Sequence, residues 1–207
     1  MSRLHPLAGK VRRTLMVIRR HARKIALAIG TATVIPLGLI AAAAPAQASH
    51  APYEGKVTAS SLNVRSAPTG ASSKVGSLSH GTTVRIQCKV FGPSVSGNSL
   101  WYKLGNGNWV TARYVSNVGS APRFCGSGQE YTGTVVSRTS LAVRSGPNTA
   151  NARVSSAPRG QELALVCKVN SQSIDGNPRW YQLTGDSGGQ WVSARYVSNV
   201  GSAPPYC

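Results

Sequence analysis

Acidic residues are scarce in this sequence, where five Asp and Glu stand against 23 Lys and Arg in 207 residues. A glycosidase needs two carboxyl groups that flank the scissile bond. Up to residue 125 the only acid is Glu54, and the four later acids show no recognisable pairing. The composition therefore argues against a glycosidase.

Histidine and cysteine are scarce as well, with four of each. Beyond the N-terminal segment only His50 and His80 remain, neither lies in a repeated motif, and there is no C-x-x-C pair. A structural zinc site and a Cys/His or Ser/His nucleophile both lack the residues they need. The sequence predicts no enzyme, no metal site and no cofactor.

The N-terminal segment has the pattern of an export signal. Residues 1–24 hold eight Lys and Arg and no acid, an apolar run covers 25–44, and Ala46-Gln47-Ala48 follows. This order of basic, apolar and small residues predicts a signal peptide, 1–48, and a secreted protein. A retained membrane anchor is the alternative, because about twenty apolar residues can span a bilayer. The pair Arg12-Arg13 leaves open whether export uses the general or the twin-arginine route.

The rest of the chain is a tandem repeat. Leu62-Asn63-Val64-Arg65-Ser66-Ala67-Pro68 returns 79 residues later as Leu141-Ala142-Val143-Arg144-Ser145-Gly146-Pro147. The offset grows to 82 between Trp109 and Trp191, which places a three-residue insertion in the loop 184–190. Loops absorb insertions at low cost, so this loop is predicted to join two strands. We expect two domains, 53–125 and 131–207, joined by the short segment 126–129.

Each repeat contains two cysteines, one within a predicted strand and one at its C-terminal end. Four cysteines allow three pairings, and the repeat selects one within each copy. The predicted disulfides are Cys88–Cys125 and Cys167–Cys207, which fit an exported protein. Alternation with polar residues places four side chains on one inward face of the strand: Val84, Ile86, Cys88 and Val90.

Neither repeat shows a helical apolar period long enough for a helix, so the predicted fold is all-β. In the first copy, strands are expected at 57–64 and 81–90, loops at 67–75 and 92–99, and a hairpin at 100–111. A short turn at 113–115 leads into a last strand. Five short strands in about 65 residues imply a small, strongly bent barrel.

Charge is the remaining signal. Eight of the 23 Lys and Arg belong to the leader, which leaves 15 against five acids and a net charge of +10. Such a surface attracts polyanions such as wall polymers. Export and the lack of a Lys/Arg cluster argue against nucleic acid as the ligand.

Four ordered motifs resemble the bacterial SH3-like domains of secreted and wall-associated proteins, and the second copy departs from one of them at Gly160–Leu163, where Gln and Glu replace two Thr. In the first copy they are Leu62–Pro68, Gly81–Val84, Trp101–Leu104 and Trp109–Val115. The second copy repeats three of them at Leu141–Pro147, Trp180–Leu183 and Trp191–Val197. The resemblance implies two tandem SH3-like β-barrels, each with one disulfide.

The resemblance also implies a non-catalytic binding module, since some of these domains hold peptidoglycan peptides in a groove between loops. We expect docking on the bacterial cell wall, either on peptidoglycan or on an anionic wall polymer, with no stable membrane span after cleavage. An extracellular protein partner or inhibitory function, presented by the loops 92–99 and 171–179, is the alternative.

The candidate ligand-binding residues are Arg65, Trp101, Tyr114, Arg144, Trp180 and Tyr196. Strand alternation places Trp101 and Trp180 on the outer or groove side, where an aromatic face beside a cation suits sugars or acidic peptides. The structural alternative is that these rings cap the barrel. The two Arg either clamp a ligand carboxylate or tie down their own loops. The two Tyr either support the core or line the groove.

Overall fold

The computed structural model describes residues 53–185 and 189–207, so the predicted signal peptide lies outside the described residues. The two repeats belong to one compact unit. Strand and short 3-10 helix bounds in the first repeat are β1 Tyr53–Val57, β2 Ser61–Arg65, β3 Lys74–Ser79, β4 Thr83–Val95, β5 Asn98–Leu104, β6 Trp109–Thr111, η1 Ala112–Tyr114 and β7 Val115–Val118.

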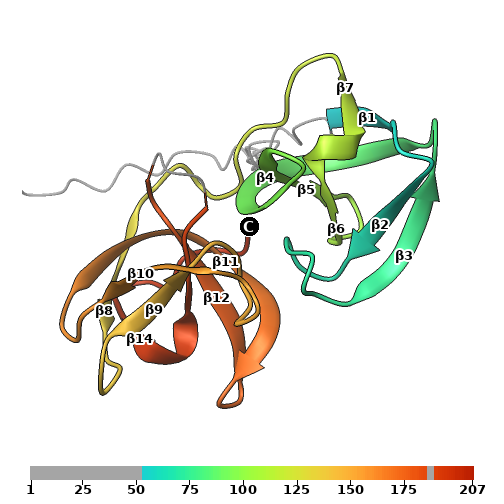
Figure 1. The fold of residues 1–207 in the computed structure, drawn as a ribbon. Helices are drawn as coiled ribbons and strands as arrows, with labels where there is room; N and C mark the ends of the chain where they lie inside the picture. Colours follow the sequence, from blue (N-terminus) through green and yellow to red (C-terminus); the bar gives the residue numbers. More distant parts are fainter. Residues whose placement is uncertain (1–52, 186–188) are drawn as a thin grey trace, which may run out of the picture. The chain divides into compact units, whose positions relative to one another are not determined.

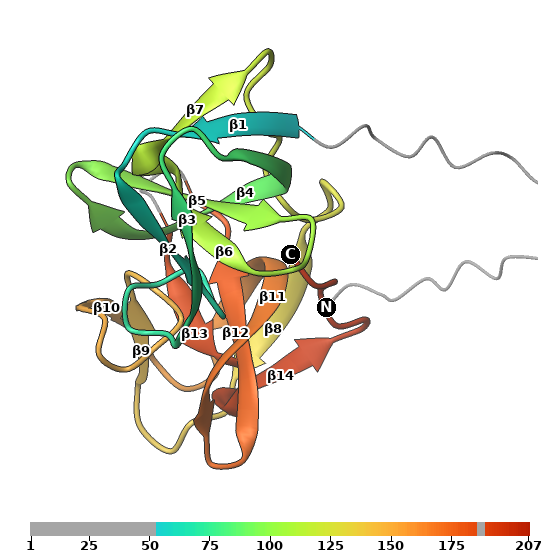
Figure 2. The same cartoon turned by 90° about the vertical axis from the view of Figure 1, so that its right-hand side faces the viewer.

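The second repeat has the same elements in the same order. They are β8 Tyr131–Val135, β9 Leu141–Arg144, β10 Arg153–Ala157, β11 Glu162–Ile174, β12 Asn177–Leu183, β13 Trp191–Ser193, η2 Ala194–Tyr196 and β14 Val197–Val200. Strand order is β3-β2-β6-β5-β4-β1-β7 in one sheet and β10-β9-β13-β12-β11-β8-β14 in the other. Each sheet curls on itself (Figures 1 and 2), which confirms the all-β, SH3-like class with two small half-barrels.

The strand limits correct several sequence expectations. The strand expected at 57–64 is two strands, because the polar segment between Val57 and Ser61 turns the chain. The loop expected at 67–75 ends where β3 begins, and β3 itself was not predicted. The connector expected at 92–99 is a tight hairpin, since β4 continues to Val95 and β5 starts at Asn98. The segment 171–179 is the matching hairpin in the second repeat.

Each barrel encloses its own apolar core. In the first repeat the core includes Val57, Leu62, Ile86 and Tyr102, and in the second Leu165, Tyr181 and Val192 belong to it. These side chains come from strands that alternate buried and exposed positions, such as β4, so burial follows the two-residue period of a strand.

A third cluster spans the two repeats and is the main feature that the sequence did not predict. It comprises all four Trp and all four Cys, with Val90 and Val169. Trp191 Nε1 donates to the Phe91 carbonyl oxygen at 3.0 Å, and Thr69 Oγ1 donates to Asn151 Oδ1 at 2.9 Å. The two repeats therefore bury one face each against the other and share a core.

A bulge in the long strand β4 turns its side chains toward this shared core. Ile86 pairs with Leu104, but Cys88 pairs with Lys103, so the register shifts by one residue between them. A one-residue shift moves the following side chains to the other face of the sheet. Val84 and Ile86 consequently face the barrel core, whereas Cys88 and Val90 face the second repeat. The expectation that all four share one face is wrong at this bulge.

The predicted disulfides Cys88–Cys125 and Cys167–Cys207 are both present, and no described cysteine is free. Each bond ties a C-terminal tail to the long strand of its own repeat. The tail also bonds to this strand, as Cys125 N donates to the Lys89 carbonyl oxygen at 2.8 Å. The tails thus cover one side of the shared core. Among the described residues there is no helix of the length and hydrophobicity that a membrane crossing requires.

Candidate functional site

Trp101 and Trp180 lie in the shared core, with 2% and 1% of their surface exposed. Their indole N–H groups donate to backbone carbonyl oxygens of Pro93 and Gln172, at 3.0 and 2.8 Å. Strand alternation placed both rings on the outer face of their barrels, and they do lie there. Both rings belong to the cluster that spans the two repeats, and their burial leaves almost no surface for a ligand.

Arg65 and Arg144 hold the loops that follow their strands. Arg65 Nη1 donates to the Ser72 carbonyl oxygen at 2.7 Å, and Arg144 Nη1 donates to those of Thr149 and Asn151, each at 2.9 Å. These are the hydrogen bonds expected of a residue that ties down its own loop. A direct contact between either Arg and a ligand stays a prediction.

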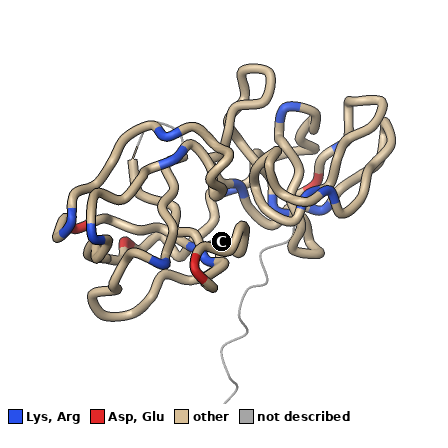
Figure 3. The backbone as a smooth tube through the Cα atoms, turned by 60° about the horizontal axis from the view of Figure 1, so that its bottom comes forward, with Lys and Arg blue, Asp and Glu red and all other residues tan. Residues whose placement is uncertain are grey.

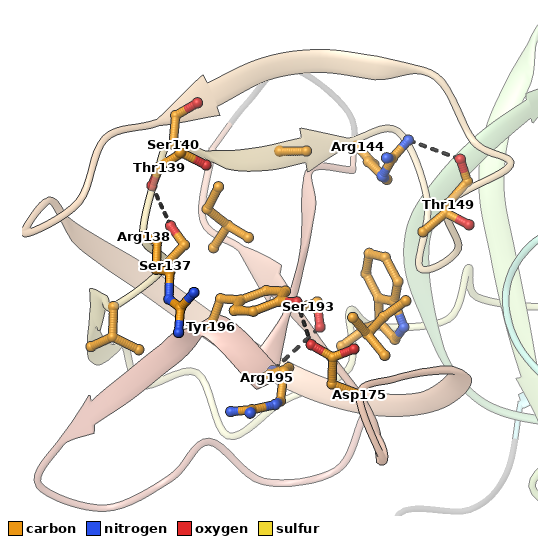
Figure 4. Close-up of a pocket in the computed structure, with 15 residues that line it drawn as sticks. Ser137, Arg138, Thr139, Ser140, Arg144, Thr149, Asp175, Ser193, Arg195 and Tyr196 are labelled. Atoms are coloured by element: carbon orange, nitrogen blue, oxygen red, sulfur yellow. Dashed lines mark hydrogen bonds between the residues drawn. The ribbon is translucent and has the colours of Figure 1, made fainter.

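A pocket in the second repeat brings together three of the predicted residues, Arg144, Trp180 and Tyr196. It has a volume of about 630 Å3 and lies between the loop 136–140, the tip of the β11–β12 hairpin and η2. In Figure 4 the Tyr196 ring lies between Arg138 and Asp175, with Arg144 further along the pocket. Trp180 contributes little open surface to it, because it is 1% exposed, so the lining combines polar side chains with the exposed Val136.

Tyr196 and Asp175 form the best-defined polar pair of this pocket. The Tyr196 hydroxyl donates to Asp175 Oδ2 at 2.7 Å. This hydrogen bond to a carboxylate, together with burial and the negative charge of Asp175, raises the pKa of Tyr196 above its usual range. Asp175 has a positive φ of 46° and precedes Gly176 at the hairpin tip, as expected for a two-residue turn. The turn therefore fixes an acid at the pocket rim.

Cationic side chains dominate the rest of the rim. Arg138 stands on the loop 136–140, and Arg195 lies with its guanidinium carbon 5.8 Å from the centroid of the Tyr196 ring. With Arg144 they give three guanidinium groups against one carboxylate. Lys and Arg also outnumber acids over the other described segments (Figure 3). The pocket therefore favours a ligand that carries carboxylate or other anionic groups.

The first repeat keeps the tyrosine and two of the three arginines of this pocket but lacks the counterparts of Arg138 and Asp175. Tyr114 lies on η1 like Tyr196, and its hydroxyl is 3.1 Å from the Ser96 hydroxyl, where the second repeat has Asp175. Arg113 lies over Tyr114 at 5.9 Å, as Arg195 lies over Tyr196. The segment between Val57 and Leu62 is one residue shorter than its counterpart between Val135 and Leu141, and it contains no Arg. The two predicted sites thus differ in charge.

Arg138 and Asp175 are functional candidates that the sequence interpretation missed. A signal was present in both cases. Val57 and Leu62 are five positions apart, whereas Val135 and Leu141 are six, and the extra length lies in the loop that carries Arg138. Asp175 replaces Ser96 before a glycine that both repeats share. Differences between two copies mark where their surfaces have diverged.

No constellation of three or more His, Cys, Asp or Glu suited to a metal ion occurs in the described ranges 53–185 and 189–207. The prediction of no metal concerns the whole chain and stays a prediction.

The strand order, the curled sheets and the loop pocket define a small β-barrel of the SH3-like class. Residues 139–198 match a protein-family model described as Bacterial SH3 domain. The match lies within the second repeat, as its motifs predicted, and the matched stretch includes most of the residues that line the pocket.

Comparison with solved structures finds NlpC2 and NlpC1 from Trichomonas vaginalis, each 10% identical to this chain with a TM-score of 0.26. The matches cover 71% and 70% of this chain, and 48% and 45% of the two structures. The chain thus spans about half the length of either. No curated protein matches the sequence.

Proposed function

We propose that this is a secreted, non-catalytic protein that docks on the bacterial cell wall through the pocket of its second repeat. The observation that carries the proposal is the pocket itself, in which three guanidinium groups and the Tyr196–Asp175 pair surround an open volume within a bacterial SH3 domain. Bacterial SH3 domains often bind cell-wall components. The two disulfides and the basic leader support a location outside the cell.

The ligand that best fits this rim is a wall peptide with exposed carboxylates. A guanidinium group presents paired N–H donors that match the two oxygens of a carboxylate. The Asp175 carboxylate, held by Tyr196, offers an acceptor to an amide or ammonium group of the same peptide. Peptidoglycan peptides carry both kinds of group, so the mixed rim favours them over a purely anionic polymer.

A pull-down with insoluble wall sacculi tests the proposal. The full-length protein is expected in the pellet at both low and moderate salt, because hydrogen bonds at contact distance depend less on salt than long-range attraction between charges. Arg138→Ala and Asp175→Ser should each reduce retention by about tenfold, which corresponds to about 1.4 kcal/mol. Both residues are exposed, so neither substitution should disturb the fold.

The first repeat supplies a matched control. Tyr196→Ala should release the protein from sacculi, whereas Tyr114→Ala, at the equivalent position on η1, should leave most retention intact. Retention lost equally by both variants would contradict a site confined to the second repeat. Specific capture of a culture-supernatant protein, with no retention on walls, would instead support the extracellular interaction module.

A further inference from the structure

A second pocket of about 600 Å3 shares no lining residue with the first. It is lined by Arg85 and Gln87 of β4, by Arg123 of the first repeat's tail, by Ser127 of the joining segment 126–129, and by Tyr206 of the C-terminal tail. Both repeats therefore contribute to it. None of these residues belongs to the motifs from which the bacterial SH3 resemblance was drawn.

Two guanidinium groups define the charge of this pocket. Arg123 Nη1 donates to the carbonyl oxygens of Phe124 and Gly126, at 3.3 and 3.2 Å, which holds the side chain at the pocket wall. Arg85 is exposed, and its cross-strand neighbour in β1 is Glu54. Lys103 donates to the Cys207 carbonyl oxygen beside the pocket, and burial lowers its pKa. The lining itself contains cations and no acid.

The pocket continues into a neighbouring hollow. A second cavity, of about 430 Å3, shares Arg123, Gly126 and Ser127 with the first and extends along the joint to Glu130. The shared residues join the two cavities into one depression, with Arg123 in the lining of both. Such a depression suits a chain molecule that passes over several donors better than it suits a single small ion. Gln87 and Ser127 add neutral hydrogen-bonding groups beside the two Arg.

We propose that this depression, with Arg85 and Arg123 as its anchors, binds a polymer linked by phosphodiesters. Guanidinium groups bind phosphate oxygens through two parallel hydrogen bonds, and they keep their charge at every accessible pH. A phosphodiester also stays ionised over that range, and its repeating charges can engage both Arg at once. The site is independent of the wall-peptide pocket and gives the protein a second contact of different chemistry.

Fluorescence anisotropy with a labelled synthetic hexamer of glycerol phosphate tests this site in the full-length protein. We expect the hexamer to bind more tightly than a labelled glutamate hexamer. The double variant R85Q/R123Q should weaken binding by about tenfold or more, equal to about 1.4 kcal/mol. Arg85→Gln alone, at an exposed strand position, tests the site without removing the Arg123 hydrogen bonds and should also weaken binding.

The control is the variant K74Q/R159Q, which removes the same net charge from exposed positions outside both cavities. It should change affinity by less than about threefold, as expected for distant surface charges. Equal losses in the two double variants would show that charge alone attracts the hexamer and would overturn the site. No binding by the unaltered protein, or equal affinity for the glutamate hexamer, would overturn the phosphodiester assignment.

Discussion

The two repeats share one fold and differ in the loops that shape their surfaces. They share strand order, and residues 112–122 are identical to residues 194–204. They differ in the loop that carries Arg138, at the hairpin tip where Asp175 replaces Ser96, and in the insertion before Trp191. The first two differences reshape one pocket, and the third bears on the contact between repeats. The comparison separates a common framework from the features that give each copy its own task.

The largest effect should come from the tryptophans that the two repeats contribute to their shared core. Trp109→Ala and Trp191→Ala should each cost about 3–5 kcal/mol of unfolding free energy, because each empties a large buried volume. Since the cluster belongs to both repeats, calorimetry should show one transition that shifts as a whole in either variant. Two separate transitions, with only the altered repeat shifted, would show that the repeats fold independently. Tyr206→Ala, at an exposed position, is the control.

A pair of equivalent glycines tests the contact between the two repeats. Gly107 and Gly189 both have positive φ, of 84° and 62°, and both precede the strand that begins with Trp. A Cβ at Gly107 would meet nothing within 4 Å, whereas one at Gly189 would lie 2.6 Å from Phe91 Cβ in the other repeat. Both Ala substitutions carry the backbone cost of about 1–2 kcal/mol.

Gly189→Ala should cost about 1–3 kcal/mol more than Gly107→Ala, because its methyl group overpacks the contact between repeats. Chemical denaturation of the two variants measures the difference. Equal costs would mean that the insertion loop does not contact the first repeat in solution.

The loop-binding arginines should differ by one hydrogen bond. Arg144 makes two bonds to backbone carbonyls and Arg65 makes one. Each such bond contributes about 1 kcal/mol. Arg144→Lys should therefore destabilise by about 2 kcal/mol and Arg65→Lys by about 1 kcal/mol. Urea unfolding of the two variants checks the order, and a reversed order would argue that Arg65 has further partners.

The smallest predicted effect concerns the ionisation of the two pocket tyrosines. The hydrogen bond to Asp175 raises the pKa of Tyr196, so its phenol should ionise at higher pH than an ordinary tyrosine. Any free energy of unfolding that this hydrogen bond contributes is present below the pKa that Tyr196 has in the unfolded chain. It is lost as pH rises through the raised pKa of Tyr196 in the folded protein. NMR of ring-labelled tyrosine should show Asp175→Ser lowering the pKa of Tyr196 while other tyrosines keep theirs. An unmoved Tyr196 would mean that the hydrogen bond does not persist in solution.

Much of the fold could be predicted, because repetition and alternation are local signals. Two β-barrels, each with one internal disulfide, could be predicted from the motif around Leu62, its return at Leu141 and the cysteine pair in each copy. The hairpin of β4 and β5 was missed because Gly92 and Pro93 look like loop residues. Gly92 lies inside β4 because there is no room for a side chain. A Cβ there would lie 2.6 Å from the Pro68 carbonyl oxygen and 2.7 Å from Trp101 Cδ1.

The candidate site was only partly predictable, because burial of an outer face depends on the other repeat. Alternation placed Trp101 and Trp180 outside their barrels, but no local pattern shows that a second barrel covers them. Arg144 and Tyr196 were found from motifs and do line a pocket. Arg138 and Asp175 were missed because the motifs record what the copies share, while the pocket charges lie where the copies differ.

The central claim is that the second repeat, and not the first, presents the ligand pocket. Titration of the isotopically labelled full-length protein with soluble muropeptides tests it most directly by NMR. The account predicts chemical-shift changes concentrated at Arg138, Asp175 and Tyr196, with Ser96 and Tyr114 unaffected at the same ligand concentrations. Equal changes in both repeats, or changes confined to the first, would contradict it.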